Sequence, residues 1–89
     1  MTDAQVLADV RQFIVENFLY MRPEIVLADD DRLLERRLID SMGIMEVIGF
    51  LDERFGVQVP EKDIREANLG SLRAIADYVL RRQHGDRAA

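Results

Sequence analysis

The residues best placed to do chemistry in this chain lie in the hexapeptide LIDSMG, residues 38–43. Ser41 directly follows an aspartate, and an apolar pattern with helical spacing begins just after it. A serine at such a position can cap a helix through its hydroxyl, act as a nucleophile, or serve as a point of covalent attachment. Asp40 could supply the cap equally well, which would leave the Ser41 hydroxyl free. A capping box would need Glu or Gln three residues on, where the chain has Ile44.

Independent catalysis by Ser41 is the least favoured of these roles. An activated serine needs a base, usually a histidine oriented by a third group. His84 is the only histidine, it lies near the C-terminus, and no G-x-S-x-G sequence surrounds the serine. A helical chain of 89 residues also offers little room for an enclosed substrate pocket. We therefore expect a protein that is not an enzyme and has no catalytic residues.

A resident metal is not expected either. The chain has no cysteine and a single histidine, so it cannot build a thiolate or multi-histidine metal site. The acidic triplet at residues 29–31 lacks the alternating ligands, central glycine and final glutamate of an EF-hand loop.

Apolar periodicity predicts three longer helices and one short one. The first covers residues 3–19 with Thr2 or Asp3 as its cap, and the second covers residues 41–55 and stops at Gly56. Pro60 suits the opening of a brief helix that runs to about residues 64–66, and Ser71 caps the last helix. The three apolar stripes contain the following residues: Val6, Leu7, Val10, Phe13, Ile14 and Phe18; Ile44, Val47, Ile48, Leu51 and Phe55; Leu72, Ile75, Ala76, Val79 and Leu80.

The fold class is therefore all-α, a four-helix bundle with a long first loop over residues 20–40. Seven apolar residues indicate that this loop packs on the core: Ile25, Val26, Leu27, Leu33, Leu34, Leu38 and Ile39. We expect one domain over residues 1–89, with its core at about 3–82 and a disordered tail at 83–89. The initial methionine, the early first helix and the short tail favour a free-standing protein.

Charge and hydropathy limit the classes of partner and the cellular location that the sequence allows. The net charge is −5, which disfavours binding to nucleic acid. Residues 40–66 hold seven acidic and three basic side chains, so −4 of that charge is local and could steer basic partners. No apolar run approaches the length of a membrane span, and the N-terminus is acidic where a secretory signal would be basic. We expect a cytoplasmic protein without a membrane span, and a monomer.

The stretch LIDSMGIMEVIGFLDERFGVQVP, residues 38–60, resembles an acyl carrier protein of the phosphopantetheine-dependent type. In that family an Asp-Ser-Leu/Met motif opens a helix, a glutamate follows five residues after the serine, and an acidic pair, a phenylalanine and a short Ile/Val-Pro ending come next. The matching residues are Asp40, Ser41, Met42, Glu46, Asp52, Glu53, Phe55, Val59 and Pro60. SLRAIADYV, residues 71–79, resembles the last helix of the family, so the resemblance spans nearly the whole chain.

The resemblance implies that a phosphopantetheinyl transferase moves the 4′-phosphopantetheine arm of coenzyme A onto the Ser41 hydroxyl, beside Asp40 and Met42. The arm ends in a thiol that carries acyl groups as thioesters, so the reactive sulfur of this cysteine-free chain would be imported. It also implies that Glu46, Asp52 and Glu53 face basic patches of partner enzymes, and that Met42 is an apolar contact. The partners would be the transferase, an acyl- or aminoacyl-loading ligase, and downstream transferases or synthases.

Several residues depart from the fatty-acid carriers of that family. Gly43 stands where an acid is usual, Arg54 interrupts the acidic run, and Arg36 and Arg37 add positive charge before the serine. These departures weaken assignment to housekeeping fatty acid biosynthesis and favour a specialised stand-alone acyl carrier in a lipid or specialised biosynthetic pathway. An aminoacyl, D-alanyl or peptidyl carrier is the alternative, and an unmodified helical protein-interaction module is the alternative of another class. Some carriers shelter acyl chains among their helices, here near Met45, Leu51, Leu69 and Ile75, although plain core packing is the favoured interpretation of those four residues.

Overall fold

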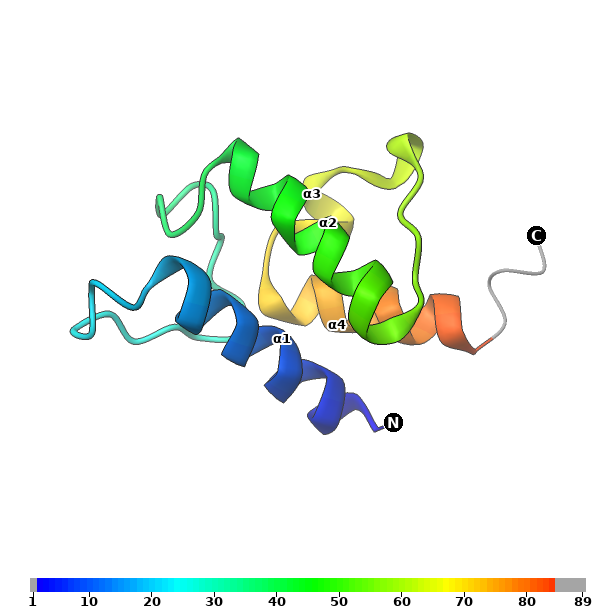
Figure 1. Cartoon of the computed structure of the whole chain (residues 1–89), viewed down its shortest axis with the longest axis horizontal. Coiled ribbons are helices and arrows are strands. Elements are labelled where there is room, and N and C mark those ends of the chain that lie inside the picture. The colour runs from blue at the N-terminus through cyan, green and yellow to red at the C-terminus, as the bar shows by residue number, and fades with distance from the viewer. Residues whose placement is uncertain (1, 85–89) are drawn as a thin grey trace.

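The computed structural model describes residues 2–84, and the described chain contains helices and loops but no strand. Three long helices form the bundle: α1 (Asp3–Phe18), α2 (Ser41–Phe55) and α4 (Leu72–Gln83). Two short elements, η1 (Glu61–Asp63) and α3 (Glu66–Leu69), connect α2 to α4. In Figure 1 the long loop between α1 and α2 lies at one end of the molecule, on the same side as the start of α2. The expected all-α bundle with a long first loop is confirmed.

The helix ends follow the chemistry of the residues at them. Thr2 and Gln5 form a capping box in which the Gln5 N–H donates to Thr2 Oγ1 (3.2 Å) and the Thr2 N–H donates to Gln5 Oε1 (2.8 Å). Helix α2 ends at Gly56, whose φ of 69° is the left-handed conformation that glycine adopts at low cost. Helix α4 reaches Gln83, and His84 follows it, so the helix extends one residue into the expected disordered tail; residues 85–89 lie outside the described chain.

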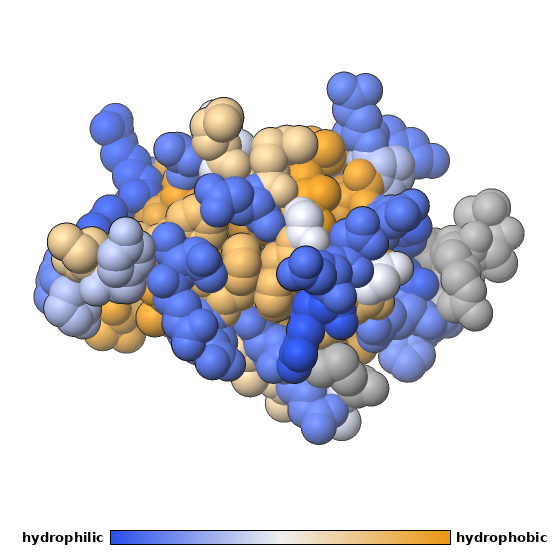
Figure 2. Space-filling model, viewed as in Figure 1, coloured by the Kyte–Doolittle hydropathy of each residue, from blue (hydrophilic) through white to orange (hydrophobic). Residues whose placement is uncertain are grey.

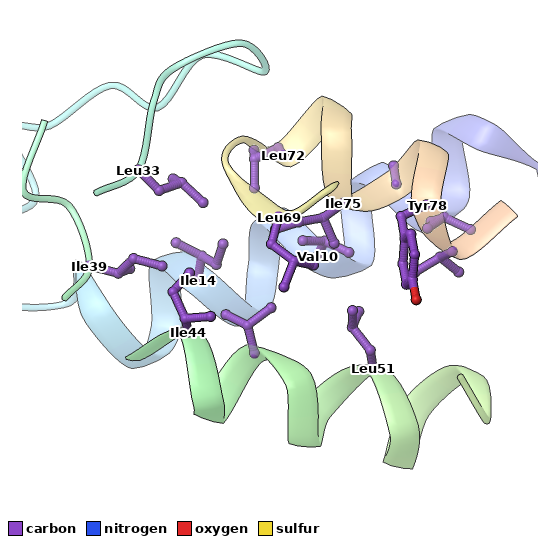
Figure 3. Close-up of a cluster of buried hydrophobic side chains, with 14 of the residues drawn as sticks. Val10, Ile14, Leu33, Ile39, Ile44, Leu51, Leu69, Leu72, Ile75 and Tyr78 are labelled. Atoms are coloured by element: carbon purple, nitrogen blue, oxygen red, sulfur yellow. The ribbon is translucent and has the colours of Figure 1, made fainter. Parts of the chain in front are cut away.

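The apolar stripes converge on one core (Figure 3). Each long helix contributes side chains with 0% exposure, among them Val6, Val10 and Ile14 from α1, Val47 and Leu51 from α2, and Leu72, Ile75, Ala76 and Val79 from α4. The residues at the edges of the three stripes are half-buried and pack against this core: Leu7, Phe13, Phe18, Ile48, Phe55 and Leu80. The helical periodicity of the sequence therefore identified the buried faces correctly.

Four phenylalanines form a row along the contact between α1 and α2. The rings of Phe13 and Phe50 stack at a centroid distance of 4.2 Å, Phe18 meets Phe13 edge-on at 6.0 Å, and Phe55 meets Phe50 edge-on at 5.8 Å. Hydrophobic surface is visible between charged side chains on the face shown in Figure 2. The row joins the second half of α1 to the second half of α2, and so helps to hold the two helices together.

The long loop is tied to the bundle by polar groups as well as by apolar ones. Asp29 pairs with Arg11 of α1 and with Arg73 of α4, and the backbone N–H of Leu33 donates to the Gly70 carbonyl (2.9 Å). Of the seven apolar loop residues, Leu27, Leu33, Leu38 and Ile39 are buried and Ile25 is half-buried. Val26 (84% exposed) and Leu34 (46% exposed) correct the expectation, because only one side of the loop can face the core.

The single short helix expected after Pro60 is wrong in its bounds. The chain instead forms two separate short helices, η1 and α3, with the non-helical residues Ile64 and Arg65 between them. Arg65 has extended backbone angles (φ −150°, ψ 162°), which interrupt a continuous helix. The Asn68 side chain donates to the Asp63 carbonyl (2.9 Å) and so bridges the two pieces.

Candidate functional site

Asp40 caps helix α2. Its backbone is extended (φ −106°, ψ −179°), and its Oδ1 accepts a hydrogen bond of 2.8 Å from the Gly43 N–H. Ser41 is therefore the first helical residue, and its side chain is exposed. Within residues 2–84, its hydroxyl makes no hydrogen bond to another group of the protein. Of the two cap assignments that the sequence left open, the one on Asp40 is confirmed, and the Ser41 hydroxyl is free for other chemistry.

Ser71 shows what a capping serine looks like in this same protein. It precedes α4, and its Oγ accepts a hydrogen bond of 3.1 Å from the Ala74 N–H. The two serines of the chain thus stand at the starts of two helices in different roles. Only the one at residue 41 has an unused hydroxyl at the positive end of a helix dipole.

The first turn of α2 rests on the end of α1. A Cβ added to Gly43 would lie 2.9 Å from Phe18 Cε1 and 3.3 Å from Ile39 Cβ, closer than side-chain atoms normally approach. A glutamate or aspartate at residue 43 would therefore displace the Phe18 ring. The same contact holds the start of α2 against α1.

A hollow of about 660 Å³ opens beside Ser41, between the end of α1, the end of the long loop and the start of α2. Asp40 and Met42, the neighbours of Ser41, both line it, and so does Glu46 one turn further along α2. Met42 is 73% exposed, as expected of an apolar contact residue. Arg37, Leu38 and Ile39, which precede the serine in the sequence, also line it. The lining residues that the sequence did not place near the site are Asn17, Phe18 and Leu34.

The acidic residues of α2 divide into a near and a far group. Glu46 follows Ser41 by five positions, which is roughly 7 Å along a helix axis, whereas Asp52 and Glu53 lie roughly 16–18 Å away. All three side chains are exposed. Arg54, which interrupts the acidic run in the sequence, is bound to Asp9 of α1 through two hydrogen bonds (3.1 and 2.9 Å). The positive charge of Arg54 is thus paired within the protein.

The four residues considered for sheltering a cargo do not form one lining. Leu51 and Ile75 are completely buried in the core, while Met45 is 57% exposed on the outer face of α2. Leu69 borders a smaller hollow of about 230 Å³ together with Ile44 and Ile64. Core packing therefore accounts for Leu51 and Ile75, as the sequence favoured.

Within residues 2–84, no histidine lines the hollow next to Ser41. His84 follows α4, and the end of α4 lies at the opposite end of the long axis from the start of α2 (Figure 1). In the part of the chain that is described, no group of three or more acidic or histidine side chains could hold a metal ion. The carboxylates of the triplet at residues 29–31 that the structure pairs, Asp29 and Asp31, are bound by arginines. Across residues 2–84, none of the helices has the length and apolar character that crossing a membrane requires.

This four-helix fold, with an exposed serine at the start of α2, is that of a small helical carrier domain. The chain matches the phosphopantetheine attachment site family over residues 12–79. It is also 28% identical over 75 residues to an acyl carrier protein of Campylobacter hominis, an alignment that covers 84% of this chain and 90% of that protein. The chain belongs to the phosphopantetheine attachment site family.

Members of this family are non-catalytic carriers of 4′-phosphopantetheine, so this chain is a carrier with that cofactor and not an enzyme. It interacts with a phosphopantetheinyl transferase and with biosynthetic enzymes. The start of α2 fits such a group, because a phosphodiester is an anion and helix N-termini stabilise anions through their unpaired N–H groups and their dipole. Once attached, the arm supplies a thiol, which the cysteine-free chain lacks.

Proposed function

We propose that Ser41 is the attachment residue, and that the chain presents acyl groups as thioesters on a 4′-phosphopantetheine arm bound to its Oγ. The observation that carries the proposal is that Asp40 caps α2 and leaves the exposed Ser41 hydroxyl unused at the helix start. The other serine is the counter-example, since its hydroxyl is occupied by the Ala74 N–H. Attachment at Ser71 would require breaking that cap.

The chemistry required of the protein itself is small. Ser41 Oγ forms a new bond to the phosphorus of coenzyme A that bears the pantetheine. The bond from that phosphorus to the anhydride oxygen breaks, adenosine 3′,5′-bisphosphate leaves, and the serine proton passes to a base of the transferase. The chain contributes an accessible nucleophile and a site that tolerates the new charge. Asp40 and Met42 contribute by position, since one fixes the first turn and the other exposes an apolar side chain beside the serine.

Partner enzymes are recognised by the outer face of α2 in this proposal. Met42, Glu46, Asp52 and Glu53 are all exposed there, and Arg54 is paired with Asp9. A carrier must leave each enzyme after visiting it, and interfaces led by charge speed encounter more than they tighten binding. The loading ligase and downstream transferases or synthases would present basic surfaces to this face.

The carrier serves a specialised pathway of acyl transfer, in lipid metabolism or elsewhere, and acts as a cytoplasmic monomer. Support for a specialised pathway comes from Gly43, whose contact with Phe18 excludes the acid usual in fatty-acid carriers. Aminoacyl or peptidyl cargo is the alternative, because the same fold and arm would carry it. A helical interaction module that takes no arm is the alternative of another class.

The test is the intact mass of the protein before and after incubation with coenzyme A and a broad-specificity phosphopantetheinyl transferase. Wild type and Ser71→Ala should each gain one phosphopantetheine, and Ser41→Ala should gain none. Circular dichroism of each variant establishes that it is folded, and a known carrier treated in parallel establishes that the transferase is active. If the wild-type protein is folded and gains no mass, the proposal that Ser41 carries the arm is wrong, and the interaction module is favoured.

A further inference from the structure

We propose that Arg37 binds the phosphodiester of the arm on Ser41, so that the attached group is held by a basic side chain of the carrier itself. This inference rests on the proposed function, because it takes Ser41 as the attachment residue. It concerns an arginine that lies four positions before the serine and has no role in the fold that the structure reveals.

Arg37 lines the same hollow as Asp40 and Met42, the two neighbours of Ser41. Arg37 therefore borders the same space as the two residues that flank Ser41 in the chain. Arginine offers five N–H donors in a planar fork that matches phosphate oxygens. The remaining charged residues of the hollow are Asp40 and Glu46, both acidic, so a phosphodiester placed there without Arg37 would meet like charges.

The charge on Arg37 is unpaired within residues 2–84, where the structure has no carboxylate in ion-pair contact with it. Its neighbour is different, since Arg36 Nη1 lies 2.6 Å from Asp31 Oδ2. The backbone carbonyl of Arg37 accepts a hydrogen bond from Arg22 Nη1 (3.4 Å), which steadies the loop at this point. The fold thus positions Arg37 and leaves its guanidinium available.

The backbone of Arg37 adopts a left-handed conformation that favours glycine. Its φ is 58°, and it is the one non-glycine residue of the described chain with a positive φ. It closes a helical turn in which the Arg37 N–H donates to the Leu34 carbonyl (3.0 Å) and the Leu38 N–H donates to the Leu33 carbonyl (2.9 Å). Glycine is the residue usually found at this position of such a turn, because it adopts a positive φ without strain. An arginine at this position is therefore strained in its backbone, and its side chain places a positive charge near the start of α2.

The experiment compares the melting temperatures of the unmodified and phosphopantetheinylated full chain for wild type, Arg37→Gln and Arg36→Gln. The glutamine variants remove one positive charge at adjacent positions, and each protein is compared with its own unmodified form, so a general loss of stability cancels. We expect the arm to raise the melting temperature of wild type by roughly 2–4 °C more than that of Arg37→Gln at low ionic strength. Arg36→Gln should behave as wild type does. The excess should largely vanish in about 1 M salt, where the screening length falls to about 3 Å.

A second readout observes the phosphodiester directly. Its ³¹P chemical shift should differ between modified wild type and modified Arg37→Gln and should be unchanged in Arg36→Gln. Arg37→Lys, which keeps the charge and loses the planar fork, should fall between wild type and Arg37→Gln in both measurements. If the arm is attached and both readouts are the same in wild type and Arg37→Gln, this inference is overturned and the proposed function stands. If wild type takes no arm, both are overturned.

Discussion

The ring of Phe18 occupies the space that a side chain at residue 43 would need, with Phe18 Cε1 2.9 Å from the position of a Cβ on Gly43. Residue 43 lies in the first turn of α2, and residue 18 is the last of α1. The two helices therefore meet close to Ser41, which we propose as the attachment residue. The contact holds the first turn of α2, and with it the proposed attachment residue, in one position for the enzymes that act on the carrier.

Two glycines of α2 should respond in opposite ways to replacement by alanine. Gly49 is exposed, and a Cβ there would have no other atom within 4 Å, so Gly49→Ala should raise the free energy of unfolding by about 0.5–1 kcal/mol through helix propensity. Gly43→Ala gains the same propensity but must displace the Phe18 ring, and overpacking costs about 1–3 kcal/mol. Urea unfolding of the two variants should show Gly43→Ala at least about 1 kcal/mol less stable than Gly49→Ala. Equal stabilities would mean that Phe18 moves aside freely.

Three polar residues at helix starts give a test of the cap assignments. Asp40→Ala and Ser71→Ala should each lower the free energy of unfolding by about 1 kcal/mol, because each removes the acceptor of a backbone N–H. Asp40→Asn should retain most of the stability, since asparagine caps helices about as well. Ser41→Ala should change stability by no more than about 0.5 kcal/mol, since its hydroxyl bonds to nothing in the fold. A large loss for Ser41→Ala with none for Asp40→Ala would show that the serine is the cap.

The sequence predicted the helices well, and it predicted the neighbours of the site poorly. Local signals are strong where a cap, an apolar stripe and a glycine stop agree, as they do for α2 between Asp40 and Gly56. The resemblance to a family pointed to Ser41 from residues that are close in sequence. The hollow beside it depends on Asn17 and Phe18, which come from another helix, and no periodicity along the chain brings them to residue 41.

The break between η1 and α3 was missed for a related reason. Residues 61–69 contain good helix formers, and their propensity favours a continuous helix. Tertiary bonds prevail: Tyr78 of α4 donates its hydroxyl hydrogen to Asp63 Oδ2 (2.7 Å), and Arg82 Nη1 donates to the Gln58 carbonyl (2.8 Å). These partners lie 15 and 24 residues apart in the chain, beyond the reach of any local pattern.

The buried hydrogen bond from Tyr78 to Asp63 should make the free energy of unfolding fall at alkaline pH. Burial, together with the hydrogen bond to Asp63, raises the pKa of Tyr78 above its ordinary value of about 10. A raised folded pKa means that the phenol's contribution is complete below the unfolded pKa and is lost as pH rises through the folded one. The urea midpoint of wild type should therefore fall between about pH 9.5 and pH 11.5, and Tyr78→Phe should lose less of its midpoint over that interval. Tyr20→Phe is the matched control, because Tyr20 is 68% exposed, and it should follow wild type.

The left-handed backbone of Arg37 predicts an unusual gain on mutation. Arg37→Gly should raise the free energy of unfolding of the unmodified protein by about 0.5–1 kcal/mol, because relief of a positive φ outweighs the greater freedom of glycine in the unfolded chain. Arg36→Gly should instead be destabilising, because Arg36 has ordinary backbone angles and pairs with Asp31. Thermal unfolding of both variants measures the contrast. Loss of stability in Arg37→Gly would mean that its side chain supports the fold.

Charge reversal on α2 should slow modification of the carrier. Glu46 is exposed and lines the hollow beside Ser41, so Glu46→Lys places a cation where a basic partner surface would approach. We expect kcat/KM for arm transfer by a broad-specificity phosphopantetheinyl transferase to fall about tenfold at low salt, and the deficit to shrink as salt screens the repulsion. Asp77→Lys makes the same change of charge on the exposed surface of α4, and its rate should stay within about twofold of wild type. An equal loss in both variants would assign the effect to net charge, whereas a loss confined to Glu46→Lys would identify the start of α2 as the surface that the transferase reads.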